Sequence, residues 1–378
     1  MSGIYIHIPF CRKKCNYCNF HFSTRFTYKS ELIKMIGTEL QMRKSELDNK
    51  PINTIYFGGG TPSLLSYFEL DFLFQNIERN YNISQLKEVT LEANPDDLSK
   101  DFLLYLKNNS PVNRLSIGIQ SFIEEDLRLM NRAHNSQQAK DCVLNAKKAG
   151  FENISIDLIY GGQTTTNKFW LDNLSQAISL EIPHISSYAL TVESKTVFDS
   201  QIKKGKIPEI DEEKQWQQFH LMREKLLENN YIQYELSNFG KNNFFSLHNS
   251  SYWKNEPYLG IGPSAHSFNG KNIRSWNISN NMKYIKSLQE KKLPSDHEII
   301  TEIDSYNEKI MLGLRTIWGV SIQEIERNFP IFIIQHFYKE LEKLEKEKKI
   351  IIQDSIIKIA TDYLFQTDGI ISKFFFTN

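Results

Sequence analysis

The sequence predicts an α/β fold whose first half is a partial (β/α)6 barrel of the TIM type. Six short runs of β-branched and apolar residues recur in that half, and segments with apolar residues three and four apart separate them. Strands and helices that alternate in this way form βαβ units around a parallel sheet. Six units suit an open or partial barrel better than a doubly wound sheet, although the pattern alone does not decide between the two.

The six strands and several of the helices between them can be placed on the sequence. We expect strands at Gly3–Ile8, Asn53–Gly58, Glu88–Ala93, Asn113–Ile119, Asn153–Tyr160 and His184–Leu190. We expect helices at Lys29–Ser45, Asp71–Asn80, Gln137–Gly150 and Asn167–Leu180. Gly150 closes the third of these helices, where glycine is favoured because it adopts the left-handed backbone angles of a helix end.

The second half of the chain is less regular. A helix is expected at Glu212–Asn230, and His248–Asn277 reads as a loop region rich in Gly, Ser, Asn and aromatic residues. From Glu302 onward the pattern changes to helices, a hairpin and a last helix, an order that resembles a winged-helix module. The helices are expected at Glu302–Leu314, Ile322–Asn328 and Ile334–Glu347, and the hairpin in "KIIIQD" and "SIIKIA".

These patterns predict three domains. Residues 1–195 are expected to form the barrel, residues 196–300 an α+β extension, and residues 301–378 a winged-helix-like domain. A winged helix raises the question of DNA binding. The run "KELEKLEKEKK" alternates in sign, however, which is typical of a solvated helix face, so no nucleic-acid partner is expected.

Composition narrows the class of protein. The 378 residues include 45 basic and 45 acidic side chains, and this balance argues against a nucleic-acid or membrane-surface binder. No apolar run approaches the roughly 20 residues that span a bilayer. The first residues, "MSGIYIHIPFC", do not resemble a secretory signal, so we expect a cytoplasmic protein. Four cysteines are too few for a disulfide scaffold in a chain of this length.

Three of the four cysteines, Cys11, Cys15 and Cys18, lie within eight residues directly after the first strand. A disulfide would leave one thiol over, and free thiols rarely cluster so closely. A structural zinc site needs a fourth ligand, for which His7 and His21 are the candidates. Thiolates alone favour an iron–sulfur cluster. Three thiolates on a four-iron cluster leave one iron open for a further ligand.

Polar residues and glycines follow the other strands. "YFGGGTPS" comes after the second strand, and its glycines let the backbone approach a ligand closely. Glu92 ends the third strand, Gln120 ends the fourth, and Asp157 lies in the fifth. Each of them alone reads as a turn or cap residue. Together they are typical of a site at the C-terminal face of a barrel.

The C-x3-C-x2-C spacing, with Tyr17 between the last two cysteines, resembles the radical S-adenosylmethionine (SAM) superfamily. In that superfamily a [4Fe–4S] cluster binds SAM at its open iron and splits it to give a 5′-deoxyadenosyl radical. The resemblance implies that Cys11, Cys15 and Cys18 bind the cluster and that the glycine run contacts the amino group of SAM.

The resemblance extends over nearly the whole chain. "YIHIPFC", "YFGGGTPSLL", "TLEANPDDL", "RLSIGIQSF", "NRAHN", "ISIDLIYG" and "YALTVESKT" occur in the order seen in oxygen-independent coproporphyrinogen III oxidases and in the related HemW-type heme chaperones. The resemblance places the following residues at positions that contact SAM: Tyr5, Tyr17, Gly59, Gly60, Thr61, Glu92, Gln120, Arg132, Asp157 and Tyr188. It makes Arg132 a source of a charge-assisted contact.

Departures from the oxidase pattern favour the HemW-type branch. The oxidase has a fourth cysteine two residues after the third, where this chain has Phe20. It also has an N-terminal extension over its site, which we do not expect here. In "YGGQTTT" a turn proline of relatives is missing, and we expect only a local loop change.

"HNSSYW", which begins at His248, matches a motif associated with heme in the HemW-type branch. An imidazole can ligate heme iron and aromatic rings can pack on a porphyrin. The alternative is a structural histidine bonded to the surrounding protein. His266 in "GPSAHSF" is a second candidate ligand, and Cys142 reads as a small buried residue in a helix.

The resemblance therefore implies a heme chaperone that carries a [4Fe–4S] cluster and SAM, binds heme and delivers it to acceptor proteins. The expected partners are heme, the acceptors (a peripheral membrane-associated one among them) and an electron donor. The first alternative is an oxygen-independent coproporphyrinogen III oxidase of porphyrin biosynthesis, an activity that we expect the chain to lack. The second is a radical SAM methyltransferase.

Overall fold

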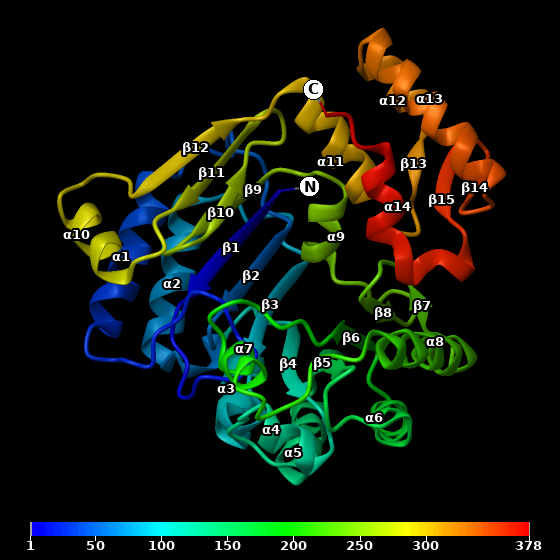
Figure 1. Ribbon diagram of the computed structural model, residues 1–378. Helices are drawn as coiled ribbons and strands as arrows, with labels where there is room; N and C mark the ends of the chain where they lie inside the picture. Colours follow the sequence, from blue (N-terminus) through cyan, green and yellow to red (C-terminus); the bar gives the residue numbers. More distant parts are fainter. Residues whose placement is uncertain (1, 378) are drawn as a thin grey trace.

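Six parallel strands in sequential order form the centre of the computed structural model, which describes residues 2–377 (Figure 1). Each strand pairs with the next one along the chain, and no strand order reverses. A doubly wound sheet requires such a reversal, so the structure is a partial TIM-type barrel. The strands are β1 Gly3–Ile8, β2 Thr54–Gly59, β3 Glu88–Ala93, β4 Arg114–Gln120, β5 Asn153–Tyr160 and β6 His184–Ala189.

Helices cover the outer face of these strands and bury their apolar sides against it (Figure 1). Two of them begin with capping boxes, built on Ser66 and Asn135. Gly150 follows α5 with φ of 94°, which confirms its role at the helix end. The helices are α1 Lys29–Met42, α2 Tyr67–Asn80, α3 Lys100–Asn109, α4 Glu124–Leu129, α5 Ser136–Lys148 and α6 Asn167–Ser179.

Further strands extend the barrel sheet at both edges. β9 Tyr258–Ile261 pairs in parallel with β1, so that Gly3 lies opposite Tyr258. Antiparallel strands β10 His266–Phe268, β11 Ile273–Asn277 and β12 Ser295–Ile299 follow, and β8 Asn238–Gly240 and β7 Ile232–Gln233 flank β6. The expectation that His248–Asn277 is a loop region is therefore wrong. The segment forms the short helix α9 Leu247–Trp253 and three strands, because β1 offers it an edge to pair with.

One hydrophobic core joins the barrel to the segment that follows it. Its buried residues run from Ile4 to Leu288 and include parts of α8 Glu212–Glu228 and α10 Asn281–Gln289. The short helix α7 Val197–Lys203 packs in a separate small cluster with Met130. The proposed domain boundaries at residues 195 and 300 stay predictions.

A second core lies in the C-terminal region, drawn in orange and red in Figure 1. Its three-stranded sheet has the order β13–β15–β14. Along the chain, β13 lies between α11 and α12, and the hairpin of β14 and β15 lies between α13 and α14. The sequence predicts the three helices, the hairpin and the last helix of this winged-helix-like module, but not the short strand β13 between the first two helices. The elements are α11 Glu302–Leu314, β13 Val320–Ser321, α12 Ile322–Asn328, α13 Ile331–Lys346, β14 Ile350–Gln353, β15 Ile356–Ile359 and α14 Thr367–Phe374.

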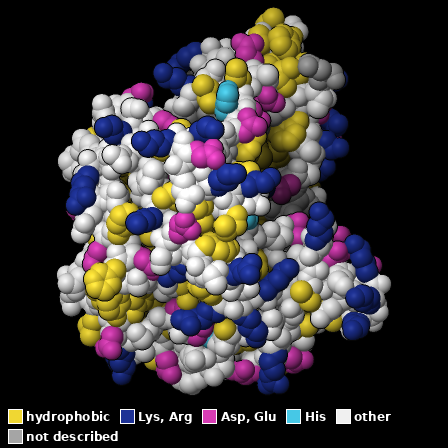
Figure 2. Space-filling view, turned by 90° about the vertical axis from the view of Figure 1, so that its left-hand side faces the viewer, with side chains coloured by type: hydrophobic (Ala, Val, Ile, Leu, Met, Phe, Trp, Pro, Cys, Tyr) yellow, Lys and Arg dark blue, Asp and Glu magenta, His cyan; other side chains and the backbone are white. Residues whose placement is uncertain are grey.

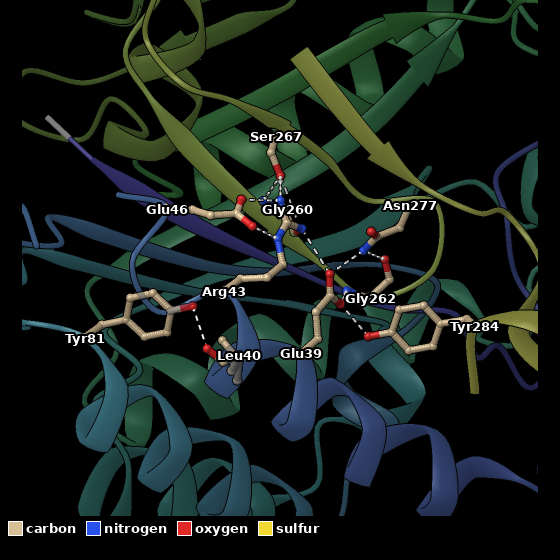
Figure 3. A network of polar contacts seen from close by, with 10 residues as sticks. All are labelled: Glu39, Leu40, Arg43, Glu46, Tyr81, Gly260, Gly262, Ser267, Asn277 and Tyr284. Atoms are coloured by element: carbon tan, nitrogen blue, oxygen red, sulfur yellow. Dashed lines mark hydrogen bonds and ion pairs between the residues drawn. The ribbon is translucent and has the colours of Figure 1, made fainter. Parts of the chain in front are cut away.

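A buried ion pair ties α1 to the strands that extend the barrel (Figure 3). Glu39 is fully buried, and its carboxylate accepts hydrogen bonds from Arg43, the Gly262 N–H, Asn277 and Tyr284. The Arg43 guanidinium also donates to the Gly260 carbonyl at 2.8 Å and to Ser267 Oγ at 3.1 Å. This network therefore fixes the turn that connects β9 to β10.

The surface carries charges of both signs. On the face that includes α1 and α10, Figure 2 shows Lys and Arg side chains interspersed with Asp and Glu, with small apolar areas between them. Within the described residues, no helix combines the length and apolarity needed to cross a membrane.

Candidate functional site

The three clustered cysteines lie in the loop between β1 and α1, at the C-terminal end of the barrel strands. All three side chains are partly exposed. Thr61 donates to Cys11 Sγ at 3.4 Å, and Arg132 Nη1 donates to Cys15 Sγ at 3.1 Å. Burial raises the pKa of Cys11 to about 11 and also raises the pKa of Cys18. Because these two thiols resist ionisation, metal binding would have to supply the free energy that holds them as thiolates.

This donor set fits a [4Fe–4S] cluster. Among the described residues, no three His, Cys, Asp or Glu side chains are placed to hold one metal ion. A four-iron cluster does not require such a group, because each thiolate binds a different iron. His7, the candidate for a fourth zinc ligand, has both ring nitrogens in hydrogen bonds, to Tyr5 OH and to the His21 carbonyl.

The glycine turn after β2 lies beside the cysteine loop. Gly59 has φ of 105°, and a Cβ there would come within 2.6 Å of the His7 ring. A Cβ on Gly60 would lie 2.6 Å from the Phe10 carbonyl oxygen. Both positions therefore require glycine. The structure brings this turn within reach of Glu92, which accepts the Gly59 N–H at 3.1 Å.

Two acidic side chains from β3 and β5 point into the barrel below this turn. Burial raises the pKa of Glu92 to about 7, although hydrogen bonds from Tyr56 and Gly59 oppose the shift. Burial likewise raises the pKa of Asp157 to about 6, and the charge of Asp157 contributes to the raised pKa of Glu92. A bound cation would relieve this unfavourable charge, so the pair is suited to an ammonium or sulfonium group.

Arg132 connects the cysteine loop to the strand ends. Its Nη1 contacts Cys15 Sγ and Tyr17 OH, and its Nη2 donates at 2.6 Å to both Asn94 Oδ1 and the Gly118 carbonyl. Its Nε is buried without a hydrogen bond among the described residues. Asn94 also donates to Thr61. Asn94 is not among the residues predicted from the sequence, although its place directly after β3 and two residues from Glu92 was a usable signal.

The remaining residues expected to contact SAM surround the same space. Gln120 ends β4 with φ of 69°, a strained angle for a residue other than glycine, at an irregularity in the pairing with β5. Tyr188 lies in β6 with its side chain exposed. The structure thus gathers the predicted residues of all six strands at one end of the barrel.

A cavity of about 540 Å³ opens between the barrel and its added strands. It reaches Tyr5, Gly59 and Glu92 on the barrel side. On the opposite side its lining is mainly aromatic and imidazole, with side chains from the cysteine loop, α9 and β9–β11: Phe20, His21, Tyr252, Tyr258, His266, Phe268 and Arg274. Phe20 is 69% exposed at its rim.

His248 does not line this cavity. Its side chain is fully buried, Nδ1 bonds Thr54 Oγ1 and Nε2 bonds Tyr252 OH, each at 2.8 Å. Burial lowers its pKa to about 3, so the ring stays neutral. Neither nitrogen is available to a heme iron in this arrangement. The structure does not support the expectation that His248 ligates heme, and it favours the structural alternative.

We expect His248→Ala to destabilise the fold by about 2 kcal/mol, since it leaves a void and two buried hydroxyl groups without their partner. Urea unfolding of the apoprotein measures the change. His266→Ala, at an exposed ring without a hydrogen bond from the described residues, is the control and should unfold as wild type does. Equal stability of the two variants would contradict the structural role of His248.

Replacing Glu92 by Gln should change how stability depends on pH. The pKa of Glu92 is higher in the folded protein than in the unfolded chain, so folding binds a proton between pH 4.5 and about 7. Relative to Glu92→Gln, wild type should therefore gain stability as the pH falls through this window and lose it as the pH rises. Denaturant midpoints of the apoprotein at several pH values test this. Glu345→Gln, on an exposed helix face, should show no such difference.

Comparison with known proteins agrees with this geometry. The radical SAM superfamily model matches residues 5–172, and the HemN C-terminal domain model matches residues 300–360. The solved structure of coproporphyrinogen III oxidase (HemN) from Escherichia coli, described as a radical SAM enzyme, superposes with a TM-score of 0.85 at 21% identity. The superposition covers 99% of this chain and 90% of that one, and it establishes the fold. The fold and the site define a radical SAM protein.

Relatives that match most of this chain identify the family to which it belongs. The heme chaperone HemW of Bacillus subtilis is 37% identical over 325 residues, which are 85% of this chain and 85% of that protein. The heme chaperone HemW of Lactococcus lactis is 34% identical over 92% of this chain and 90% of that protein. The chain belongs to the HemW family, as its sequence motifs predict.

Proposed function

We propose that this protein is a heme chaperone, which binds a [4Fe–4S] cluster, SAM and heme and delivers the heme to acceptor proteins. The observation that carries the proposal is the similarity to HemW chaperones along most of the chain, at up to 37% identity. The aromatic cavity beside the cysteine loop supports it, because a flat apolar macrocycle packs well on aromatic rings.

In this proposal Cys11, Cys15 and Cys18 hold the cluster, which supplies an open iron and a source of single electrons when it is bound. Arg132 keeps positive charge beside Cys15, with its Nη1 donating to Cys15 Sγ at 3.1 Å. Thr61 and Asn94 position the loop by hydrogen bonds to Cys11 and to Arg132.

SAM would lie over the strand ends, with its cationic groups toward Glu92 and Asp157. The turn at Gly59 and Gly60 would present backbone groups to its amino-acid part, and glycine is needed there because any Cβ would meet neighbouring protein atoms. A protonated Glu92 would attract the cation less, so SAM affinity should fall as the pH drops below about 7.

Phe20 separates this role from that of the oxidase. It places an exposed aromatic ring at the cavity rim, where the oxidase pattern has a further cysteine. An apolar rim favours contact with a porphyrin face or with an acceptor protein. We therefore do not assign coproporphyrinogen oxidation to this chain.

One anaerobic reconstitution, divided into three assays, tests the proposal. Hemin titration should give one hemin per chain, and apo-acceptor hemoproteins should take the hemin up from the loaded protein. Coproporphyrinogen III with SAM and a reductant should give no protoporphyrinogen. Absence of stoichiometric hemin binding would refute the chaperone role, and sustained protoporphyrinogen formation would establish the oxidase instead. Transfer of a labelled methyl group from SAM would identify a methyltransferase.

A further inference from the structure

We infer that His266, on β10, is the axial ligand of the heme iron, and that heme binds in the cavity between the cysteine loop and β9–β11. The inference rests on the proposed heme-binding function and specifies its site. It moves the heme ligand from the buried histidine of "HNSSYW", on the helix α9, to an exposed histidine on the strand β10.

The histidines around the cavity differ in what their ring nitrogens already do. Both nitrogens of His7 are in hydrogen bonds, and His7 is buried. The Nε2 atom of His21 bonds Asn281 Oδ1 at 2.7 Å, and its ring is half-buried. The His266 ring is exposed and has no hydrogen bond from any residue that the structure describes. The Nδ1 atom of His21 and both ring nitrogens of His266 have no hydrogen bond from the described residues, but only the His266 ring is exposed, so it can meet iron without moving out of the protein.

The backbone holds His266 in a defined place. The preceding turn contains Ser264 with φ of 65°, and the following residue, Ser267, is bonded to the buried Arg43 (Figure 3). Gly260 lies so close to His266 that a Cβ there would approach the His266 carbonyl oxygen to 1.9 Å. The Trp276 ring stands beside the imidazole, with centroids 6.3 Å apart. A ligand mounted on a rigid strand loses little entropy when it binds a metal.

The rest of the cavity suits a porphyrin. Tyr252, Tyr258 and Phe268 supply aromatic surface, and Phe20 adds an exposed ring at the opening. The one guanidinium in the lining, Arg274, already pairs with Glu308 at 2.7 Å. The two propionates of the heme are therefore expected to stay in water at the cavity mouth. Such a heme is accessible from outside, as transfer to another protein requires.

The cavity also reaches Glu92, Gly59 and Tyr5, which are proposed SAM contacts. Heme and SAM would thus occupy neighbouring parts of one space. Binding of either ligand is expected to change the affinity for the other, and thermodynamic linkage makes that effect reciprocal.

Hemin titration of cluster-loaded wild type, His266→Ala, His21→Ala and His266→Met tests the assignment. We expect His266→Ala to weaken hemin binding by at least about tenfold and to shift the Soret band, with imidazole added to the buffer restoring the spectrum. His266→Met should bind hemin with the altered spectrum of a thioether ligand. His21→Ala should bind as wild type does. Unchanged cluster content and denaturant midpoint in His266→Ala show that the variant is folded.

The outcomes distinguish the assignment of His266 as the heme ligand from the proposal that the protein is a heme chaperone. If wild type binds hemin and His266→Ala binds it with the same affinity and spectrum, His266 is not the ligand, whereas the chaperone function stands. Loss of hemin binding in His21→Ala, with unchanged hemin binding in His266→Ala, would likewise overturn the assignment and identify His21 as the ligand. If wild type binds no hemin, the assignment and the proposed function both fail.

Discussion

Replacement of Cys15 by Ser is expected to abolish the iron–sulfur cluster while the fold persists. Cys15 is partly exposed, and its thiol contacts Arg132 rather than the hydrophobic core. Serine conserves the size of the side chain but is a poor ligand for iron, which binds thiolates in such clusters. After anaerobic reconstitution, iron and sulfide bound per chain should fall at least about tenfold, and the brown colour should be lost.

Cys142 provides the matched control. It lies buried in α5, and its thiol donates to the Ala139 carbonyl of the preceding turn. Cys142→Ala should therefore reconstitute as wild type does. Hemin binding should survive in Cys15→Ser, because the proposed axial ligand is His266 and not a thiolate. A Cys15→Ser protein that keeps a full complement of iron and sulfide would show that the C-x3-C-x2-C loop does not hold the cluster in the way proposed.

Replacement of Glu39 by Ala should cost about 3–5 kcal/mol of folding free energy, as expected when one partner of a buried ion pair is removed. The change leaves the guanidinium of Arg43, 3% exposed, without its buried counter-charge. It also leaves the Gly262 N–H and the Tyr284 hydroxyl without an acceptor, and it leaves the Asn277 amide with only the Gly262 carbonyl. Urea unfolding followed by circular dichroism measures the loss.

Glu46 is the control for this network. It also binds Arg43, at 2.7 Å, but its side chain is 39% exposed, so water replaces much of the interaction. We expect Glu46→Ala to cost about 1 kcal/mol or less. Similar losses in the two variants would mean that the contacts in Figure 3 do not make Glu39 a central acceptor. Since the network holds Ser267, Glu39→Ala should also loosen His266 and weaken hemin binding.

Local sequence signals predicted the barrel well because each of its strands is a short run rich in β-branched and apolar residues, and helical segments separate the runs. β1, β3 and β5 have the expected bounds, and the other three differ by one residue at one or both ends. The strands from β9 to β11 were missed for a physical reason. They have three to five residues each, contain glycine and serine, and exist because β9 pairs with the distant β1. No short window of sequence contains that pairing.

The candidate site likewise contains residues that the sequence predicted and residues whose environment it did not predict. The residues at strand ends were identifiable because a barrel brings the ends of its strands together. The environment of His248 was not identifiable, since its motif does not indicate that the ring faces Thr54 inside the barrel. The Glu39–Arg43 pair has the spacing of an ordinary exposed helix pair, and only the arrival of β9 buries it.

The parallel pairing of β1 with β9 has a consequence for biosynthesis. As the nascent chain leaves the ribosome, the strand that leads into the cysteine loop acquires β2 early, but its other edge stays open until Tyr258–Ile261 have been made. Such long-range pairing raises the contact order and slows folding. It also leaves an unpaired edge exposed to other chains in the meantime. His266 emerges directly after β9, so the pocket proposed for heme is completed only once this edge can close. The fold would thereby delay capture of the proposed heme cargo until more than two thirds of the chain has been made.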